Sequence, residues 1–454
     1  MPTRRGLITG LAALMAYNAI PREAEAAFAS FIAKSGTGGG GYDNLANPPS
    51  IGKPGHIAAN RPLIAGGGTQ LTFTAPLYGG PSTSSDVQQT VNLTNTSSTI
   101  NSASDGGTPS FTNSSASIGL TNTLTANLKV VFYTTGVLPS PLIAGNGYFV
   151  IATGLSTSAF QVSATQGGSP ITLDTTSMSG THTVGQLIEQ FNITVGNTAA
   201  GVNVTHKFVT VRRNAITVGG GTSGQGNCVR IPNSTTNYNT IVEDNWLDGG
   251  NDTDSYNVAN SFGGGTTNGL TVRRNTTGGC EKPMTPQVQQ NTLLIDNYVW
   301  NCAGPDPDGT DAWFVTNSCF GILCKHNYFD GTSGGTQWDS AINCTNYPLT
   351  GSGASISNIV YQSNYHDMPN CTHCIIVDSS YGGGGNTNLI TGVQLLDNGF
   401  TTNVSQVFSD IKGATNPAAQ ITANSGNFLM ASQSATSGTL VNAGTGVLAN
   451  GTNS

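Results

Sequence analysis

An asparagine recurs along the second half of the chain at intervals of 22 to 37 residues, each time inside a short run of alternating hydrophobic and polar positions. The seven asparagines are Asn214, Asn245, Asn275, Asn297, Asn327, Asn364 and Asn398. Uneven intervals of this size are typical of solenoid coils with loops of variable length, and they argue against the regular blades of a β-propeller. We therefore expect residues 187–430 to form a solenoid.

Three hydrophobic columns accompany the asparagines with a period of two. Three positions before them stand Val211, Val242, Val272, Leu294, Cys324, Tyr361 and Leu395. Five positions before them stand Val209, Thr240, Leu270, Thr292, Ile322, Ile359 and Val393, and two positions after them stand Ile216, Leu247, Thr277, Val299, Phe329, His366 and Phe400. Alternate residues of a β-strand point to one face, so these columns should line one interior while the residues between them face solvent. A helical repeat is excluded because the period of 3.6 is absent.

The recurring asparagine fits a bend between two short strands, where stacked amide side chains hydrogen-bond to the backbone and to each other. Further β runs begin between the repeats at Asn227, Ala312, Ser340 and Cys374. Each of these runs would supply the third side of its coil.

These repeats resemble those of the right-handed parallel β-helix of pectate lyases, polygalacturonases and phage tailspikes. The resemblance covers half of the chain and implies an all-β fold, a single-stranded right-handed parallel β-helix preceded by a small antiparallel β module. It does not identify the function, because the fold serves lyases, hydrolases and adhesins. The polygalacturonase pattern is not reproduced: the run 251–254 matches its first carboxylate motif only in part, and no Asp-Asp pair follows.

The remaining segments differ in character. Residues 110–186 contain short β runs between Gly/Ser/Pro turns, which predict the small β module, and this passage resembles a module of phage and prophage structural proteins. Residues 35–109 predict a Gly/Ser/Thr-rich arm with irregular strands, and residues 431–454 a C-terminal cap or tail.

Residues 1–34 predict the destination of the protein. Arg4 and Arg5 precede the apolar stretch 6–20, and the run 24–26 (Ala-Glu-Ala) is a small-x-small cleavage signature. This order resembles a bacterial twin-arginine export signal. The alternative is an N-terminal helix that is retained, as in a protein assembled into a virion. The apolar stretch is too short for a comfortable transmembrane span.

Composition and charge narrow the partners. With 60 Gly and only 9% charged and 7% aromatic residues, the chain is expected to be rich in β structure and turns. The net charge is −7 and no Lys/Arg-rich run exists beyond the N-terminus, so we expect no nucleic-acid partner.

All eight cysteines lie between Cys228 and Cys374, and an even number fits disulfides in an oxidising compartment. The candidates are Cys319 with Cys324 and Cys371 with Cys374. Reduced structural thiols are the first alternative, and a redox pair or half of a metal site at the run 371–374 is the second. No second CxxC motif completes a zinc site, so we expect no metal and no cofactor.

Charged residues gather directly before the asparagines, with opposite signs in neighbouring repeats. These residues are Arg212, Arg213, Glu243, Asp244, Arg273, Arg274, Asp296, Lys325 and His326. We interpret the alternation as ion pairing between rungs, which prevents like charges from stacking. A lyase interpretation would instead take Lys325, His326 and Asp296 as a base and charge neutraliser for a uronate substrate.

Aromatic residues directly follow several asparagines, at Trp246, Tyr298, Tyr328 and Tyr365. Alternation predicts that they face outward, and the three tyrosines occupy consecutive rungs about 4.8 Å apart. Aromatic faces bind sugars, so this column is a candidate glycan-binding surface. Stacking that stabilises the sheet is the alternative.

A candidate catalytic group lies in the acidic loop that contains Asp306, Asp308 and Asp311. Glycoside hydrolysis needs two carboxylates roughly 5–10 Å apart, and loops on a rigid scaffold are where function concentrates. Asp is also an ordinary turn residue, which is the alternative interpretation.

The sequence favours a phage- or prophage-related virion protein of tailspike or fibre type, located outside the cell or on the virion surface. Its expected partners are a host-surface polysaccharide and other virion proteins, and the tailspike resemblance implies a homotrimer. An exported polysaccharide lyase or glycoside hydrolase is the first alternative. A structural decoration protein or adhesin without a glycan ligand is the second.

Overall fold

The computed structural model describes residues 89–92 and 100–429, except 190, 197, 220–225, 232–238, 261–266, 286–288, 303–310, 317–318, 326, 331–339, 346–354, 363, 368–372, 379–389, 397, 402–408, 413–420 and 426–427. The predicted N-terminal segment 1–34 and the predicted tail 431–454 lie outside the described residues.

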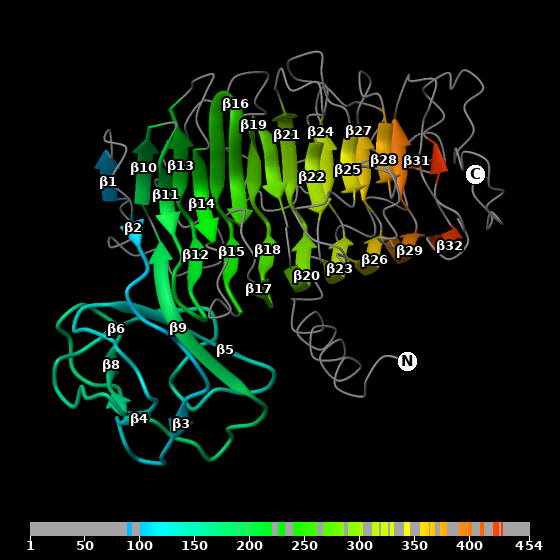
Figure 1. Ribbon diagram of the computed structural model, residues 1–454. Helices are drawn as coiled ribbons and strands as arrows, with labels where there is room; N and C mark the ends of the chain where they lie inside the picture. The colour runs from blue at the N-terminus through cyan, green and yellow to red at the C-terminus, as the bar shows by residue number, and fades with distance from the viewer. Residues whose placement is uncertain are drawn as a thin grey trace, which may run out of the picture.

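The described part of the chain is all-β, as predicted, and contains no helix. Two long parallel sheets form the coils of a parallel β-helix, which stack along one axis from β1 and β10 at one end to β31 and β32 at the other (Figure 1). A small antiparallel module lies beside the first coils (Figure 1).

The strands fall into three sheets. The 17-stranded sheet comprises β1 (Gln89–Asn92), β2 (Ile100–Asn101), β10 (Phe191–Val195), β11 (Ala200–Asn203), β13 (Ala215–Val218), β14 (Asn227–Ile231), β16 (Trp246–Asn260), β19 (Thr276–Thr285), β21 (Tyr298–Cys302), β22 (Asp311–Thr316), β24 (Tyr328–Asp330), β25 (Ser340–Thr345), β27 (Tyr365–Asp367), β28 (His373–Asp378), β30 (Gly399–Thr401), β31 (Ser409–Lys412) and β33 (Phe428–Leu429). The 13-stranded sheet comprises β5 (Lys129–Thr134), β6 (Gly147–Val150), β8 (Val162–Ser163), β9 (His182–Glu189), β12 (Thr210–Arg212), β15 (Ile241–Glu243), β17 (Thr267–Asn268), β18 (Thr271–Arg273), β20 (Gln289–Ile295), β23 (Phe320–Lys325), β26 (Ile356–Gln362), β29 (Ile390–Leu396) and β32 (Ile421–Ser425). The three-stranded sheet comprises β3 (Ser110–Phe111), β4 (Ile118–Gly119) and β7 (Ala159–Phe160).

The interior of the β-helix is built from the three predicted columns. Every described side chain in them is at most 3% exposed, and most of the hydrophobic members belong to one continuous core. Register is also as predicted, because Val211 pairs with Val242, and Val242 with Val272. The runs expected to form the third side of the coil are β14, β22, β25 and β28, which pair with strands of neighbouring coils. Period two in the sequence therefore placed the core correctly.

A ladder of buried asparagine amides runs along the coils. All seven repeat asparagines are 0% exposed. The Nδ2 of Asn245, for example, donates to Asn275 Oδ1 at 3.0 Å in the next rung and to the Val211 carbonyl oxygen at 2.9 Å in the previous one. The backbone N–H of Asn245 also donates to Asn275 Oδ1 at 3.0 Å. Each amide therefore satisfies backbone groups at the bend and joins adjacent coils.

Left-handed corners flank the strands that precede the asparagines. Six positions before the asparagines, φ is positive at Phe208, Asn239, Gly269, Asn291, Gly321, Asn358 and Gly392, and one position before them at Arg213, Asp244, Arg274 and Asp296. Asn and Gly are the residues that adopt this conformation most readily. Six of the seven corners that lie six positions before an asparagine therefore carry a suitable residue. Phe208 is the exception, and it lies where the β-helix meets the module.

One strand is shared by the two parts of the molecule. β9 pairs antiparallel with β5 in the module and parallel with β12 in the β-helix. The backbone of β9 lies close to the corner at Phe208. No side chain fits at Gly185, since an added Cβ would lie 1.6 Å from the Phe208 carbonyl oxygen. The predicted boundary between residues 186 and 187 therefore falls inside a continuous strand.

The start of the β-helix differs from the predicted arm at residues 35–109. β1 and β2 lie in that range, yet they pair in parallel with β10 and β11 and form the first coil. Their repeat pattern is not visible in the sequence, because the whole module is inserted between this first coil and the next.

Candidate functional site

The outer face of the 17-stranded sheet carries the predicted aromatic column. Trp246 pairs with Thr276, Thr276 with Tyr298, Tyr298 with Tyr328 and Tyr328 with Tyr365. Their neighbours Leu247, Val299, Phe329 and His366 are all 0% exposed inside the coils, so the aromatic column lies on the opposite face, as predicted.

Trp246 and Tyr298 of this column were expected to be exposed to solvent, and that prediction is wrong. Trp246 and Tyr298 are only 1% and 2% exposed, although both lie on the outer face. Alternation determines the face of the sheet, whereas the segments that pack over that face determine access to solvent. Tyr328 and Tyr365 are placed by register on β24 and β27, and their side chains lie outside the described part of the structure.

A second column runs beside the aromatic one, two residues further along each strand. Trp300 pairs with Asp330, and Asp330 pairs with Asp367. Period two places these residues on the same outer face as the tyrosines. Sequence reasoning did not single out this column, although the same alternation that located the tyrosines would have found it.

The register makes Asp330 and Asp367 direct neighbours on adjacent rungs. Neighbouring parallel strands are about 4.8 Å apart, so the two backbone positions are adjacent. The predicted acidic loop contributes less: Asp306 and Asp308 lie outside the described residues, and Asp311 starts β22, where it pairs with Ser340. Asp311 therefore belongs to a different strand column from the aromatic one.

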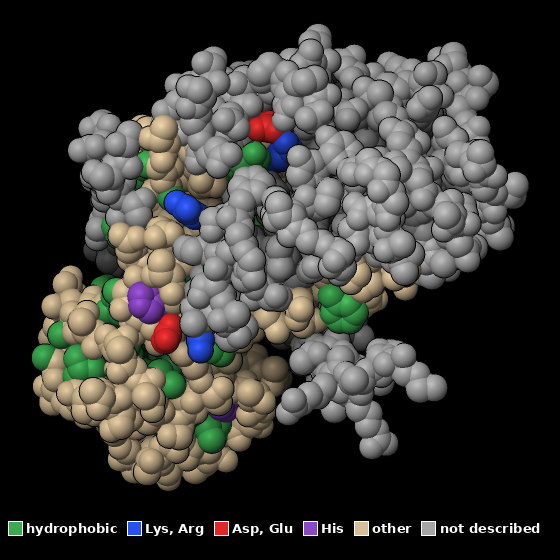
Figure 2. All heavy atoms as spheres, viewed as in Figure 1, with side chains coloured by type: hydrophobic (Ala, Val, Ile, Leu, Met, Phe, Trp, Pro, Cys, Tyr) green, Lys and Arg blue, Asp and Glu red, His purple; other side chains and the backbone are tan. Residues whose placement is uncertain are grey.

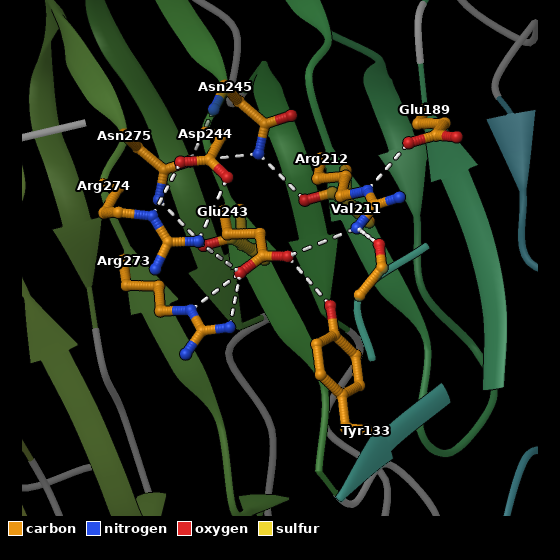
Figure 3. Close-up of polar contacts among 12 residues, drawn as sticks. Tyr133, Glu189, Val211, Arg212, Glu243, Asp244, Asn245, Arg273, Arg274 and Asn275 are labelled. Carbon is orange, nitrogen blue, oxygen red and sulfur yellow. Dashed lines mark hydrogen bonds and ion pairs between the residues drawn. The ribbon is translucent and has the colours of Figure 1, made fainter. Parts of the chain in front are cut away.

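The charged columns form a buried network at the junction with the module (Figure 3). Glu243 is its centre: Oε2 lies 2.7 Å from Arg273 Nη2 and 2.8 Å from Arg274 Nη2, and Oε1 lies 4.0 Å from Arg212 Nη1. The Glu243 side chain is 3% exposed. The predicted ion pairing between rungs is confirmed in these coils.

The same network extends to the neighbouring rungs. Arg212 Nε lies 2.7 Å from Glu189 Oε2, and Arg274 Nε lies 2.8 Å from Asp244 Oδ1. Lys129 of the module pairs with Glu189. Acidic and basic groups therefore alternate along the stack, so that no like charges are left facing each other without a counter-charge.

The module supplies contacts that sequence reasoning missed. The hydroxyl of Tyr133 donates to Glu243 Oε1 at 2.8 Å, and Arg212 donates to the carbonyl oxygen of Gly145 (Figure 3). Tyr133 lies 110 residues before its partner, and nothing local to either residue signals the contact.

Electrostatics give this network a structural role. Burial alone would raise the pKa of Glu243, but Arg273, Arg274 and Arg212 outweigh it and hold the pKa well below its usual range. Burial, together with the Glu243 carboxylate, raises the pKa of Tyr133. The Glu243 carboxylate thus accepts the Tyr133 hydrogen bond as the centre of a buried ion network.

The lyase interpretation involves three residues further along the charged columns. His326 lies outside the described residues. Asp296 is 5% exposed at a left-handed corner, and its backbone N–H donates to the Lys325 carbonyl oxygen at 3.1 Å. Burial lowers the pKa of Lys325, which lies on the outer face of the 13-stranded sheet. The aromatic column lies on the other sheet.

Asp248 is a buried acid near the start of the long strand β16. It is 1% exposed, and Oδ1 accepts a hydrogen bond from the Gly250 N–H at 2.8 Å. Burial raises its pKa to about 6. Folding therefore favours the protonated form of Asp248 more than the unfolded chain does.

We expect Asp248→Asn to stabilise the protein at pH 8 but not at pH 4. The folded pKa lies above the unfolded value, so the contribution of Asp248 to stability is fully present at low pH and is lost as pH rises through about 6. Asn retains the acceptor for Gly250 without the charge, which gives a gain on the order of 1–3 kcal/mol at pH 8. Thermal melting of both proteins at pH 4, 6 and 8 measures the effect, and a pH-independent difference would contradict it.

The disulfide prediction is wrong for Cys319 and Cys324. Neither forms a disulfide, nor do Cys228, Cys280 and Cys344, and all five are 0% exposed. Cys324 belongs to an interior column of the β-helix, where a thiol packs as a small hydrophobic group. Burial raises the pKa of the Cys324 and Cys344 thiols, which keeps them protonated and unreactive. The side chains of Cys371 and Cys374 lie outside the described part of the chain.

The described residues contain no cluster of His, Cys, Asp and Glu that could hold a metal ion. Within the same residues no helix is long and apolar enough to cross a membrane.

The stacked parallel sheets place this chain in the class of parallel β-helix proteins, and comparisons with known proteins assign it to no family. No protein-family model matches the sequence, and no curated protein matches it. Among solved structures, the tailspike protein gp49 from Pseudomonas phage LKA1 is similar over 75% of this chain, with 11% sequence identity and a TM-score of 0.23. This chain spans 64% of that tailspike. A likeness of this degree leaves the function to be argued from the site itself.

Proposed function

We propose that this protein is a virion-associated receptor-binding protein of tailspike or fibre type, which presents its β-helix to a host-surface polysaccharide. The observation that carries the proposal is the pair of in-register columns on the outer face of β21, β24 and β27. One column contains Tyr298, Tyr328 and Tyr365, and the other contains Trp300, Asp330 and Asp367.

The chemistry of these columns supports a sugar ligand. Aromatic faces bind the apolar faces of sugar rings, and carboxylates accept hydrogen bonds from hydroxyl groups. Three rungs span about 10 Å, a length that accommodates successive units of a glycan. The asparagine ladder and the buried core hold the rungs in fixed register, so the binding groups are pre-organised.

The module supports a role in attachment to other virion proteins. Among the described residues, the exposed large hydrophobic side chains are Val137, Ile143 and Met178, and all three belong to the module. Figure 2 shows hydrophobic side chains scattered over the visible surface of this part of the molecule. The shared strand β9 and the ion network would fix the orientation of the module relative to the β-helix.

We expect the double variant Tyr328→Ala/Tyr365→Ala to weaken glycan binding by about 1–3 kcal/mol, since each aromatic face contributes about 0.5–1.5 kcal/mol beyond area burial. The assay measures retention of the protein on a panel of bacterial capsule and lipopolysaccharide preparations. Thermal melting should change little, because the outer face does not fill the core. Ile143→Ala, a truncation on the exposed module, is the control and should bind normally.

Glycoside hydrolysis is a second candidate, favoured by the adjacent positions of Asp330 and Asp367. If the protein cleaves its ligand, the same panel will release new reducing ends, and Asp330→Asn and Asp367→Asn will each abolish release while retention persists. One rung of separation matches the retaining mechanism, so the product should keep its anomeric configuration. Retention without new ends supports receptor binding alone. If the protein is neither retained on any preparation nor cleaves one, only the scaffold or adhesin role remains.

A further inference from the structure

One titratable side chain packs into the hydrophobic core of the module. His182 begins β9 and is 6% exposed. Val184 follows two positions later on the same strand and belongs to the module core, so period two places the His182 ring on the core side of the sheet. The ring meets Phe111 edge to face, with 5.6 Å between the ring centroids. His182 is therefore packed as a core residue, although its ring carries two polar nitrogens.

Neither ring nitrogen of His182 has a partner among the described residues. Both Nδ1 and Nε2 are buried, and neither makes a hydrogen bond there. A neutral imidazole has one N–H donor and one acceptor, whereas the protonated ring has two donors and a positive charge. An unpaired buried charge costs more than an unpaired buried dipole, so the site tolerates the neutral ring and opposes its protonation. Burial accordingly lowers the pKa of His182.

The module offers the protonated ring no counter-charge. Its residues 100–189, all of which the structure describes, contain four charged side chains besides the histidine, at Asp105, Lys129, Asp174 and Glu189. Lys129 and Glu189 pair with each other at the opposite end of β5 and β9. The two aspartates accept the backbone N–H groups of Lys207 and Thr176. β3, which carries Phe111, has no charged residue. Every charge of the module is thus engaged away from the ring.

His182 lies where an exposed ribbon of the module begins. It pairs with Thr134 at the end of the β5–β9 ladder. Beyond this pair the two chain segments continue side by side: the Val137 N–H donates to the Ser179 carbonyl oxygen at 2.9 Å, and the Ser179 N–H donates to the Val137 carbonyl oxygen at 3.0 Å. Val137 and the neighbouring Met178 are 49% and 37% exposed. A change at His182 would therefore reach the ribbon that carries these two apolar side chains.

The other end of β9 is held by separate contacts. The strand runs from the module into the β-helix, where Leu187, Ile188 and Glu189 pair with β12 (Figure 1). Glu189 is also bound to Arg212 at 2.7 Å. These contacts do not involve the histidine, so a disturbance at His182 should stay within the module.

We propose that His182 is an acid-sensitive switch: protonation of its ring in mildly acidic surroundings loosens the packing of β3, β5 and the Val137 ribbon, while the β-helix stays folded. The sign follows from linkage. The folded pKa is lowered, so the contribution of His182 to stability is present above its unfolded pKa of 6.5 and is lost as pH falls. The switch goes beyond the proposed function and does not depend on the glycan site, so either can fail alone.

Amide hydrogen exchange of the full-length protein at pH 7.5 and pH 5.0 tests the switch, with each rate divided by the intrinsic rate at the same pH. We expect protection of β3 and β5 to fall between about threefold and about thirtyfold at pH 5.0. The upper figure is the ratio of protonated to neutral histidine in an unfolded chain. Protection of β20 and β23 in the β-helix should not fall. Unchanged protection of β3 and β5 would overturn the proposal.

Two variants assign the effect to the ring of His182. His182→Phe keeps an aromatic side chain against Phe111 but cannot titrate, so protection of β5 should be the same at both pH values. His206→Gln is the matched control: it removes a partly exposed histidine that is hydrogen-bonded to Ser102 at 2.9 Å, and the acid-induced loss should persist. A loss that persists in His182→Phe, or that vanishes in His206→Gln, would reject His182 as the switch.

A direct titration covers the case in which His182→Phe does not fold. The ring of His182 in the unaltered protein, followed by NMR with labelled histidine, should titrate with a pKa below 6.5. The resonances of β5 should change together with it. A pKa of His182 at or above 6.5 would contradict the proposal whatever the variants show.

Discussion

Replacing Glu243 with glutamine should lower the free energy of unfolding by about 3–5 kcal/mol, the usual cost of removing one partner of a buried ion pair. The change preserves shape but leaves Arg212, Arg273 and Arg274 facing a neutral group. It also weakens the bond from Tyr133, which ties the module to the β-helix. We therefore expect the module to detach from the first coils before the remaining coils unfold.

Thermal melting and limited proteolysis at the junction measure this effect. Asp174→Asn is the matched control, because it removes a carboxylate from the exposed surface of the module and should change stability little. The pH dependence has a defined sign: the folded pKa of Glu243 is depressed, so its contribution is present above the unfolded pKa near 4.3 and is lost as pH falls. Unchanged melting of Glu243→Gln near neutral pH would show that the network does not hold the junction.

Val242→Asp should unfold a segment of the β-helix. Val242 is 0% exposed and pairs with Val211 and Val272 in the interior column. An unpaired charge in that position costs several kcal/mol. Each coil is stabilised by its neighbours, so the loss should spread to the adjoining rungs.

Ile241→Asp is the control for this prediction. Ile241 precedes Val242 on the same strand but is only half-buried and points to the opposite face. Amide hydrogen exchange should therefore report loss of protection across β12, β15 and β18 in Val242→Asp and much less in Ile241→Asp. Equal loss in both variants would show that the assigned faces of β15 are wrong.

Most of the β-helix could be predicted from the sequence because the pattern that specifies each coil lies within a short stretch of residues. The columns that contain Val242, Asn245 and Leu247 depend only on period two and on the preference of asparagine for a stacked bend, and both are visible within a dozen residues. The first coil could not be predicted in this way, because the intervening module separates β1 and β2 from their partners β10 and β11 in the sequence.

The candidate site was predicted less completely. The tyrosine column and its register follow from the repeat, and the neighbouring Asp330 and Asp367 follow from the same alternation. Burial of Trp246 and Tyr298 does not, since alternation determines the face of a strand and not the access of that face to solvent. Cys319 and Cys324 do not form the disulfide predicted from count and spacing alone, because pairing requires a geometry that sequence does not specify.

The sequence by itself determined which face of each strand a residue occupies, because strand geometry imposes period two on every repeat. Only the tertiary structure decided which outward residues meet solvent, which meet the module and which are buried. Tyr133 and Glu243 are 110 residues apart, and Leu293 and Ile295 look like any other outward pair in a strand. Contacts over such separations depend on where whole elements pack, and no local pattern encodes that placement.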